Sequence, residues 1–136
     1  MPWTCEICGR IFNRKGQYHS CKQRSLDAAF SRQGEKWRYL YAELKKRVEE
    51  RIGPFAEHCP SVGVMWKHTS TFGEVKFKRA FMEVVFYSDR FRPDRNPTRW
   101  LQTSVNRTAH VVAVSDDSLF DDIVDWLEES YFLTKR

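Results

Sequence analysis

The sequence predicts an α+β fold in which a mainly antiparallel sheet of about five strands packs with two helices. Apolar residues recur every three or four positions over 36–52 and again over 118–133, which is typical of amphipathic helices. Five short runs rich in β-branched and aromatic residues lie between these segments. Because the runs are joined by short connections, we expect one antiparallel sheet with both helices on one face.

Residues 5–21 (CEICGRIFNRKGQYHSC) have the composition and spacing of a metal site. Two thiolates two residues apart can bind one tetrahedral ion from a tight turn, and a histidine with a third cysteine completes the set. The predicted ligands are Cys5, Cys8, His19 and Cys21. Three Cys and one His leave no open coordination position, so we expect structural Zn²⁺. The predicted fold is therefore a zinc knuckle followed by an α+β domain.

The knuckle differs from a Cys2His2 finger. No second ligand pair is completed at 24–26, where the sequence reads Arg, Ser and Leu, so we expect no long recognition helix. A segment this small buries too little surface to fold alone, and metal binding would supply the missing free energy, about 10–16 kcal/mol in zinc-finger peptides. His58 and Cys59 are a weaker rival pair, and we expect Cys59 to be a buried free thiol.

The chain divides into a knuckle over 1–24, a linker over 25–35 and an α+β domain over 36–136. The first helix ends at Gly53-Pro54, a common helix stop. Aspartates cluster at the start of the second helix, where negative charge complements the helix dipole. The five expected strands are 62–67, 72–78, 80–87, 99–105 and 108–114. Residues 89–98 contain two prolines and many charges, which predicts a loop.

Composition and charge exclude some classes of protein. No apolar run reaches the roughly 18 residues of a membrane span, and the N-terminus has no apolar signal segment, so we expect a cytoplasmic protein. Residues 1–24 carry a formal charge of +4, residues 76–107 carry +5, and residues 115–130 carry seven acids and no base. This polarity favours an anionic partner for the basic parts, and a solvated surface of mixed sign is the alternative.

The chain resembles bacterial proteins of domain-of-unknown-function family 5655, in the architecture with an N-terminal zinc knuckle. The specific match is WTCEICGRIFNRKGQYHSC, residues 3–21. The body adds the patterns TFGEVKFKRAFMEVVFY, RW, TAHVVAV and LFDDIVDWLEESY. The resemblance implies an α+β domain behind a zinc site, and it implies no established activity.

The leading functional hypothesis is binding of DNA or RNA, single-stranded or structured. Arginines can bind phosphates and aromatic rings can stack on unpaired bases, and residues 86–100 interleave both types. The predicted contacts are Arg10, Arg14, Lys15, Lys22, Tyr87, Phe91, Arg92, Arg95 and Arg99. We expect Phe86 and Trp100 to lie in the core instead, with Tyr87 on the opposite strand face and Phe91 in the loop.

Two other classes compete with this hypothesis. The alternative is a protein-interaction adaptor that uses the open face of the sheet, with the zinc purely structural. An enzyme is not expected, because the sequence has no recognised nucleophile–base or metalloprotease motif. The loose catalytic candidates are His68, His110 and Glu74, and we expect His110 to be a satisfied histidine of a strand.

Overall fold

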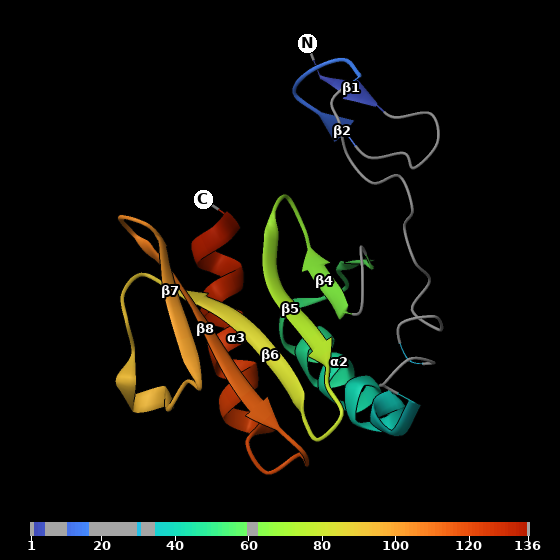
Figure 1. Cartoon of the computed structure of the whole chain (residues 1–136), viewed down its shortest axis with the longest axis vertical. Helices are drawn as coiled ribbons and strands as arrows, with labels where there is room; N and C mark the ends of the chain where they lie inside the picture. The colour runs from blue at the N-terminus through green and yellow to red at the C-terminus, as the bar shows by residue number, and fades with distance from the viewer. Residues whose placement is uncertain (1, 5–10, 17–29, 31–34, 60–62, 136) are drawn as a thin grey trace.

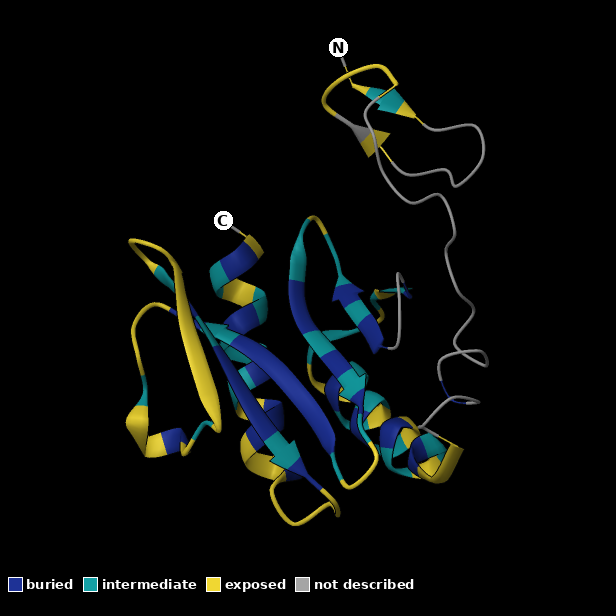
Figure 2. Ribbon diagram, viewed as in Figure 1, coloured by how far each residue is buried: buried dark blue, intermediate teal, exposed yellow. Residues whose placement is uncertain are grey.

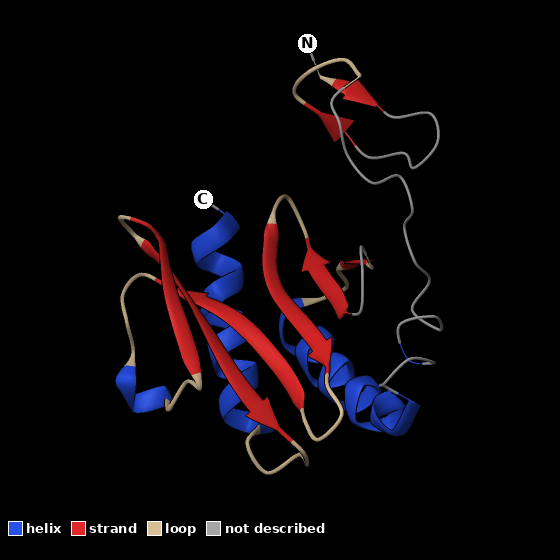
Figure 3. Ribbon diagram, viewed as in Figure 1, coloured by secondary structure: helices blue, strands red, loops and turns tan. Residues whose placement is uncertain are grey.

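A computed structural model describes residues 2–4, 11–16, 30, 35–59 and 63–135 (Figure 1). It confirms the α+β fold: a six-stranded antiparallel sheet packs against two α-helices, as the ribbon coloured by secondary structure shows (Figure 3). In chain order the elements are β1 (Trp3–Thr4), β2 (Ile11–Phe12), the short 3-10 helix η2 (Glu35–Trp37), α2 (Arg38–Ile52), β3 (Ala56–His58), β4 (Gly63–Lys67), β5 (Thr71–Phe77), β6 (Met82–Ser88), the 3-10 helix η3 (Pro93–Arg95), β7 (Arg99–Ser104), β8 (Arg107–Val114) and α3 (Phe120–Lys135).

Each predicted helix and strand is present within two residues of its expected bounds. The sequence did not predict β3, the sixth strand of the sheet. Its three residues, Ala-Glu-His, have neither the β-branched content nor the alternation that mark a strand. This segment is a strand because its backbone groups pair with those of β4, and not because of its own sequence pattern.

The strand order in the sheet is β3-β4-β5-β6-β8-β7, and every neighbouring pair is antiparallel. Strand β8 therefore lies between β6 and β7, although β7 comes before it in the chain. Residues 89–98 must cross one end of the sheet to connect β6 to the outer strand β7. The sheet thus has two very different edges, the three-residue β3 and the six-residue β7.

Both helices cover the same face of the sheet. Tyr41 of α2 contacts the rings of Trp66 and Phe77, and Trp126 of α3 lies 5.2 Å from the Phe86 ring. The strand register places Trp66, Phe77 and Phe86 on one face, so the helices share it. Figure 2 shows this arrangement as dark, buried strands in front of helices that bury one side each. Phe86 is fully buried there, as predicted.

Ser130 joins α3 to two strands of the sheet. Its hydroxyl donates to the carbonyl oxygen of Phe72 in β5 and accepts from the backbone N–H of Tyr87 in β6, at 2.9 Å for the second bond. A buried hydroxyl costs free energy unless it is paired, and here both of its roles are used. This contact fixes how α3 lies across β5 and β6, and β6 leads into residues 89–98.

Phe30 also belongs to the core of the body. It lies within the predicted linker 25–35, yet it is buried, with its ring 4.7 Å from Phe77 and 5.6 Å from Tyr41. The guanidinium of Arg38 lies over its outer side, 4.6 Å from the ring centroid.

Candidate binding site at strand β7

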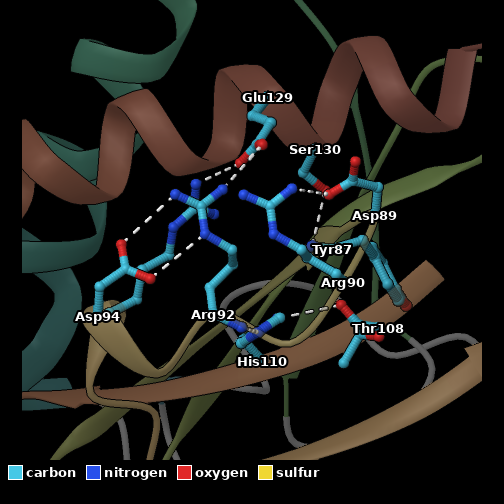
Figure 4. A network of polar contacts seen from close by, with 10 residues as sticks. Tyr87, Asp89, Arg90, Arg92, Asp94, Thr108, His110, Glu129 and Ser130 are labelled. Atoms are coloured by element: carbon cyan, nitrogen blue, oxygen red, sulfur yellow. Dashed lines mark hydrogen bonds and ion pairs between the residues drawn. The ribbon is translucent and has the colours of Figure 1, made fainter. Parts of the chain in front are cut away.

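The arginines of residues 89–98 are held by carboxylates of the same molecule. Arg92 lies between Asp94 and Glu129 of α3, at 3.3 Å and 3.5 Å, as Figure 4 shows. Arg95 also donates to Glu129, and its guanidinium lies 5.4 Å from the ring centroids of Phe86 and Trp126. Only 7% of Arg95 is exposed. Both side chains therefore attach residues 89–98 to α3, which lowers the charge that they can offer to a phosphate.

His110 holds the same segment from the sheet side. Its Nε2 accepts a hydrogen bond from the backbone N–H of Arg92 at 2.9 Å, and its Nδ1 lies 3.1 Å from the carbonyl oxygen of Thr108. This pattern requires a neutral ring with the proton on Nδ1. The ring is fully buried and stacks parallel to Phe86 and Phe91, at 5.2 Å and 6.0 Å. Burial lowers the pKa of His110, with the positive charges of Arg95 and Arg92 acting in the same direction.

Phe91 and Trp100 form an exposed aromatic pair. Their ring centroids are 4.3 Å apart, and 38% of Phe91 and 51% of Trp100 are exposed. Phe91 lies in the loop, as predicted, but the expectation that Trp100 lies in the core is wrong. The physical reason is the strand order: Trp100 sits on an outer strand, beyond the reach of α2 and α3.

Strand β7 is exposed at each of its six residues. It carries two large apolar side chains, Trp100 and Leu101, and Leu101 is 67% exposed. Val105, just beyond the end of the strand, is 86% exposed. Among the described strands it pairs only with β8, so its other edge presents backbone N–H and C=O groups. The opposite edge of the sheet is short and is followed by Pro60, which limits pairing there.

Two predicted contact residues lie on the face of the sheet that the helices leave uncovered. Arg99 of β7 donates to Glu83 at 3.1 Å, and this carboxylate is only 3% exposed. Tyr87 lies on the same face, opposite to Phe86 as predicted, with the Arg107 guanidinium 5.9 Å from its ring centroid. Burial raises the pKa of Tyr87, so its hydroxyl stays protonated at neutral pH.

The acidic segment 115–130 is paired in part with arginines of α2. Arg51 of α2 pairs with Asp125 of α3 at 2.7 Å, and Arg47 pairs with Asp117 at 3.3 Å. Residues 35–135 carry sixteen Lys and Arg and sixteen Asp and Glu, so their formal net charge is zero. The excess positive charge of the chain lies in residues 1–34, with six basic and two acidic side chains, and in Arg136. Charge alone thus gives the body no preference for an anionic partner.

The predicted zinc site lies outside the described residues. All four ligands, Cys5, Cys8, His19 and Cys21, fall there, as do Arg10 and Lys22. Arg14 and Lys15 are described and exposed, after the short β1–β2 pair. In the part of the chain that the structure does describe, no three His, Cys, Asp or Glu side chains are grouped as metal ligands. Cys59 is a buried free thiol, as predicted, and burial raises its pKa.

The loose catalytic candidates do not come together. His110 faces the helices, whereas Glu74 lies on the opposite face of the sheet, since it pairs with Val85 rather than with the core positions. His68 lies after β4 and contacts Thr134 near the end of α3, at 3.3 Å. These three side chains therefore form no nucleophile–base set.

A second polar cluster lies between α2 and β3. Glu57 accepts from the Tyr41 hydroxyl and from Lys45, the latter at 2.8 Å, and Trp66 Nε1–H donates to the Tyr41 oxygen at 3.0 Å. A pocket of about 300 Å³ lies beside it. Burial and the hydrogen bond to Glu57 raise the pKa of Tyr41 far above its ordinary value. Tyr41 is therefore a structural donor rather than a base.

Comparisons with known proteins agree with this description of the body. Residues 26–134 match the family described as "Domain of unknown function (DUF5655)". The match covers most of the chain, so the protein belongs to this family, which fits the α+β domain described above. Comparison with curated proteins and with solved structures gives no match. Neither α-helix of the described residues is long and apolar enough to cross a membrane.

Proposed function

We propose that the chain is a non-enzymatic, zinc-bearing interaction module whose body binds a protein partner at strand β7. The observation that carries this proposal is the exposure of β7: all six residues are open to solvent, and Trp100 and Leu101 are among them. Exposed edges with apolar side chains are pairing templates, which natural proteins usually cover or charge. An extended segment of the partner would add a strand there, with backbone hydrogen bonds supplying affinity and side-chain pockets supplying specificity.

The aromatic pair gives such a segment a specific contact on the helix side of β7. Trp100 is opposite His110 in the sheet register, and Phe91 stacks on both rings. Because Arg92 and His110 hold the segment that carries Phe91, the pair is positioned before a partner arrives. This prearranged surface is why we prefer the edge at β7 to the uncovered face of the sheet, where the charges of Glu83 and Arg99 are paired with each other.

A photo-crosslinking experiment tests the proposal. A benzophenone amino acid replaces Thr103 of β7 in the full chain, expressed in its native cells, and replaces Phe132 of α3, which is 55% exposed, as the matched control. We expect a discrete adduct with a polypeptide from position 103 and not from position 132. No adduct from position 103, or the same adducts from both positions, would contradict a docking site at β7.

Nucleic-acid binding is the second candidate, and a different observation favours it. The excess positive charge lies in residues 1–34, where Arg14 and Lys15 are exposed. We propose that, if the chain binds DNA or RNA, phosphate contacts come mainly from this segment, with Phe91 as the stacking candidate of the body. In this reading Cys5, Cys8, His19 and Cys21 bind structural Zn²⁺ and hold the basic side chains together. The cysteine cluster also fits a reducing cytoplasm, where we place the module.

Fluorescence anisotropy separates the basic segment from the loop arginines. Labelled single-stranded DNA, duplex DNA and hairpin RNA are titrated at low and near-physiological salt. We expect Arg14→Glu with Lys15→Glu to weaken binding and to reduce the salt slope by about one to two units, because two phosphate contacts are lost. The control, Arg92→Gln, should change the affinity and the salt slope little, since Asp94 and Glu129 already neutralise that side chain. Weak binding at low salt only, equal for all three ligands, would remove this candidate.

A further inference from the structure

We infer that the polypeptide segment that pairs with β7 is β7 of a second copy of this chain. This inference rests on the proposed docking site and names its occupant. Two identical edges can pair antiparallel around a two-fold axis, which closes the assembly at a dimer. The two six-stranded sheets would then continue into each other, with all four helices on one side.

The two faces of β7 restrict the register of such a pair. With the two-fold axis perpendicular to the sheet, residues opposite each other must lie on the same face, so the axis passes through one residue and its own copy. Trp100 faces the helices because it pairs with His110, and Leu101 faces the uncovered side because it pairs with Ala109. Each possible centre therefore gives a defined set of neighbours.

Centring the pair on Leu101 uses the exposed apolar side chains on both faces. Leu101 then contacts Leu101 of the second copy, and Trp100 lies against Gln102 of the second copy, so both large apolar groups lose contact with water. Arg99 lies opposite Thr103, which avoids opposing like charges. If the centre moved by one residue, Gln102 would lie on the axis and Trp100 would lie against Ser104 of the second copy. The centre at Leu101 also keeps most of the pair before the register shift that begins after Gln102.

The charge of β7 favours a copy of itself over a charged partner. Its one ionisable residue, Arg99, already donates to the buried Glu83 at 3.1 Å. The edge therefore has no uncompensated charge to select an acidic or basic segment. In an antiparallel pair centred on Leu101, its uncharged residues face uncharged residues of the second copy, except that Arg99 faces Thr103.

The contact is small, so we expect a weak dimer. Four or five residues from each copy cover less than the roughly 1,600 Å² of a standard interface. We expect a dissociation constant on the order of 10–100 μM, with monomer at low concentration. The equilibrium would respond to changes at single side chains on the axis.

Sedimentation equilibrium of the zinc-loaded full chain, from about 5 μM to about 1 mM, tests the dimer and its register. We expect the wild-type mass to rise from one copy toward two. Leu101→Lys and Leu101→Glu should each remain monomeric, because each places two like charges on the axis. A mixture of the two variants should associate again, since a lysine then faces a glutamate. Val105→Lys, at an exposed site beyond the pair, is the control and should behave as wild type.

The recovery on mixing separates pairing from damage to the fold, because two misfolded variants would not restore each other. A wild-type chain that is monomeric at about 1 mM overturns the inference, and so does loss of association in the Leu101 variants without recovery on mixing. The crosslinking result then distinguishes the two proposals. If the chain stays monomeric, an adduct of position 103 with another protein keeps the docking site at β7, whereas the absence of any adduct removes that site as well.

Discussion

At the scale of single residues, His110 connects protonation to the position of the aromatic pair. Its neutral ring accepts the Arg92 N–H and stacks on Phe91. Protonation would replace that acceptor with a second donor and would place a positive charge near Arg92 and Arg95, and the negative charge of Glu129 would compensate it only in part. The fold therefore favours neutral His110.

This preference predicts lower stability in mild acid. The pKa of His110 in the folded chain lies below its ordinary value of 6.5, so the unfolded chain binds more protons as the pH falls through that value. Stability is full above about pH 7 and decreases as the pH falls toward the folded-state pKa. Urea unfolding at pH 7.5, 6.5 and 5.5 measures it.

His110→Gln should reduce this dependence on pH, because a glutamine amide does not titrate and its oxygen can still accept the Arg92 N–H. His68 needs a separate control, His68→Gln, since burial lowers its pKa as well. An unchanged pH dependence in His110→Gln would contradict the role given to this ring.

Tyr41 gives a second prediction at this scale. Tyr41→Phe removes the hydroxyl that donates to Glu57 and accepts from Trp66. Because this leaves a buried indole N–H without its acceptor, we expect a loss of about 1–3 kcal/mol in the free energy of unfolding. Chemical denaturation measures it, with Tyr39→Phe as the control, since Tyr39 is 90% exposed. Equal effects of the two substitutions would show that the Tyr41 network contributes nothing.

At the scale of elements, the spacing between strands and helices depends on two glycines. A Cβ on Gly63 would lie 2.6 Å from the carbonyl oxygen of Val75, in the backbone of the neighbouring strand. A Cβ on Gly73 would lie 2.8 Å from Cδ2 of Leu127, the flexible end of a side chain on α3. The first obstacle cannot move without opening the β4–β5 pair, whereas the second can rotate away.

We therefore expect Gly63→Ala to cost about 1–3 kcal/mol and Gly73→Ala to cost less. Thermal or chemical unfolding of the two variants gives the comparison, and hydrogen exchange locates the weakened strand. The reverse order would mean that packing of α3 on β5 is tighter than the pairing of β4 with β5.

At the scale of the whole molecule, we predict that the metal site and the body fold separately. If residues 1–24 bind Zn²⁺ as the spacing predicts, Cys8→Ser should release the metal ion and unfold this segment, because metal binding would supply its folding free energy. The body has its own apolar core and should keep its unfolding transition. Metal content by mass spectrometry and amide spectra of the two regions measure this. Loss of cooperative folding throughout the chain would contradict the separation.

Periodicity in the sequence was sufficient for much of the fold. Apolar residues every three or four positions, such as Tyr41, Leu44 and Val48, predicted α2, and a run rich in β-branched and aromatic residues predicted β5, because each of these patterns belongs to the element itself. The family resemblance was also visible in the body and is confirmed. The predicted zinc ligands stay a prediction of the spacing alone.

Only the tertiary structure decided what the charged and aromatic residues of 86–100 do. The sequence places Arg92 and Arg95 in a basic loop, but strand order brings that loop against Glu129, more than thirty positions later, where charges of opposite sign pair. The same order puts β7 at the edge of the sheet, so Trp100 is exposed although its pattern resembles a core position. Local pattern determines which face of an element is apolar, whereas exposure and charge pairing depend on neighbours that only the folded chain supplies.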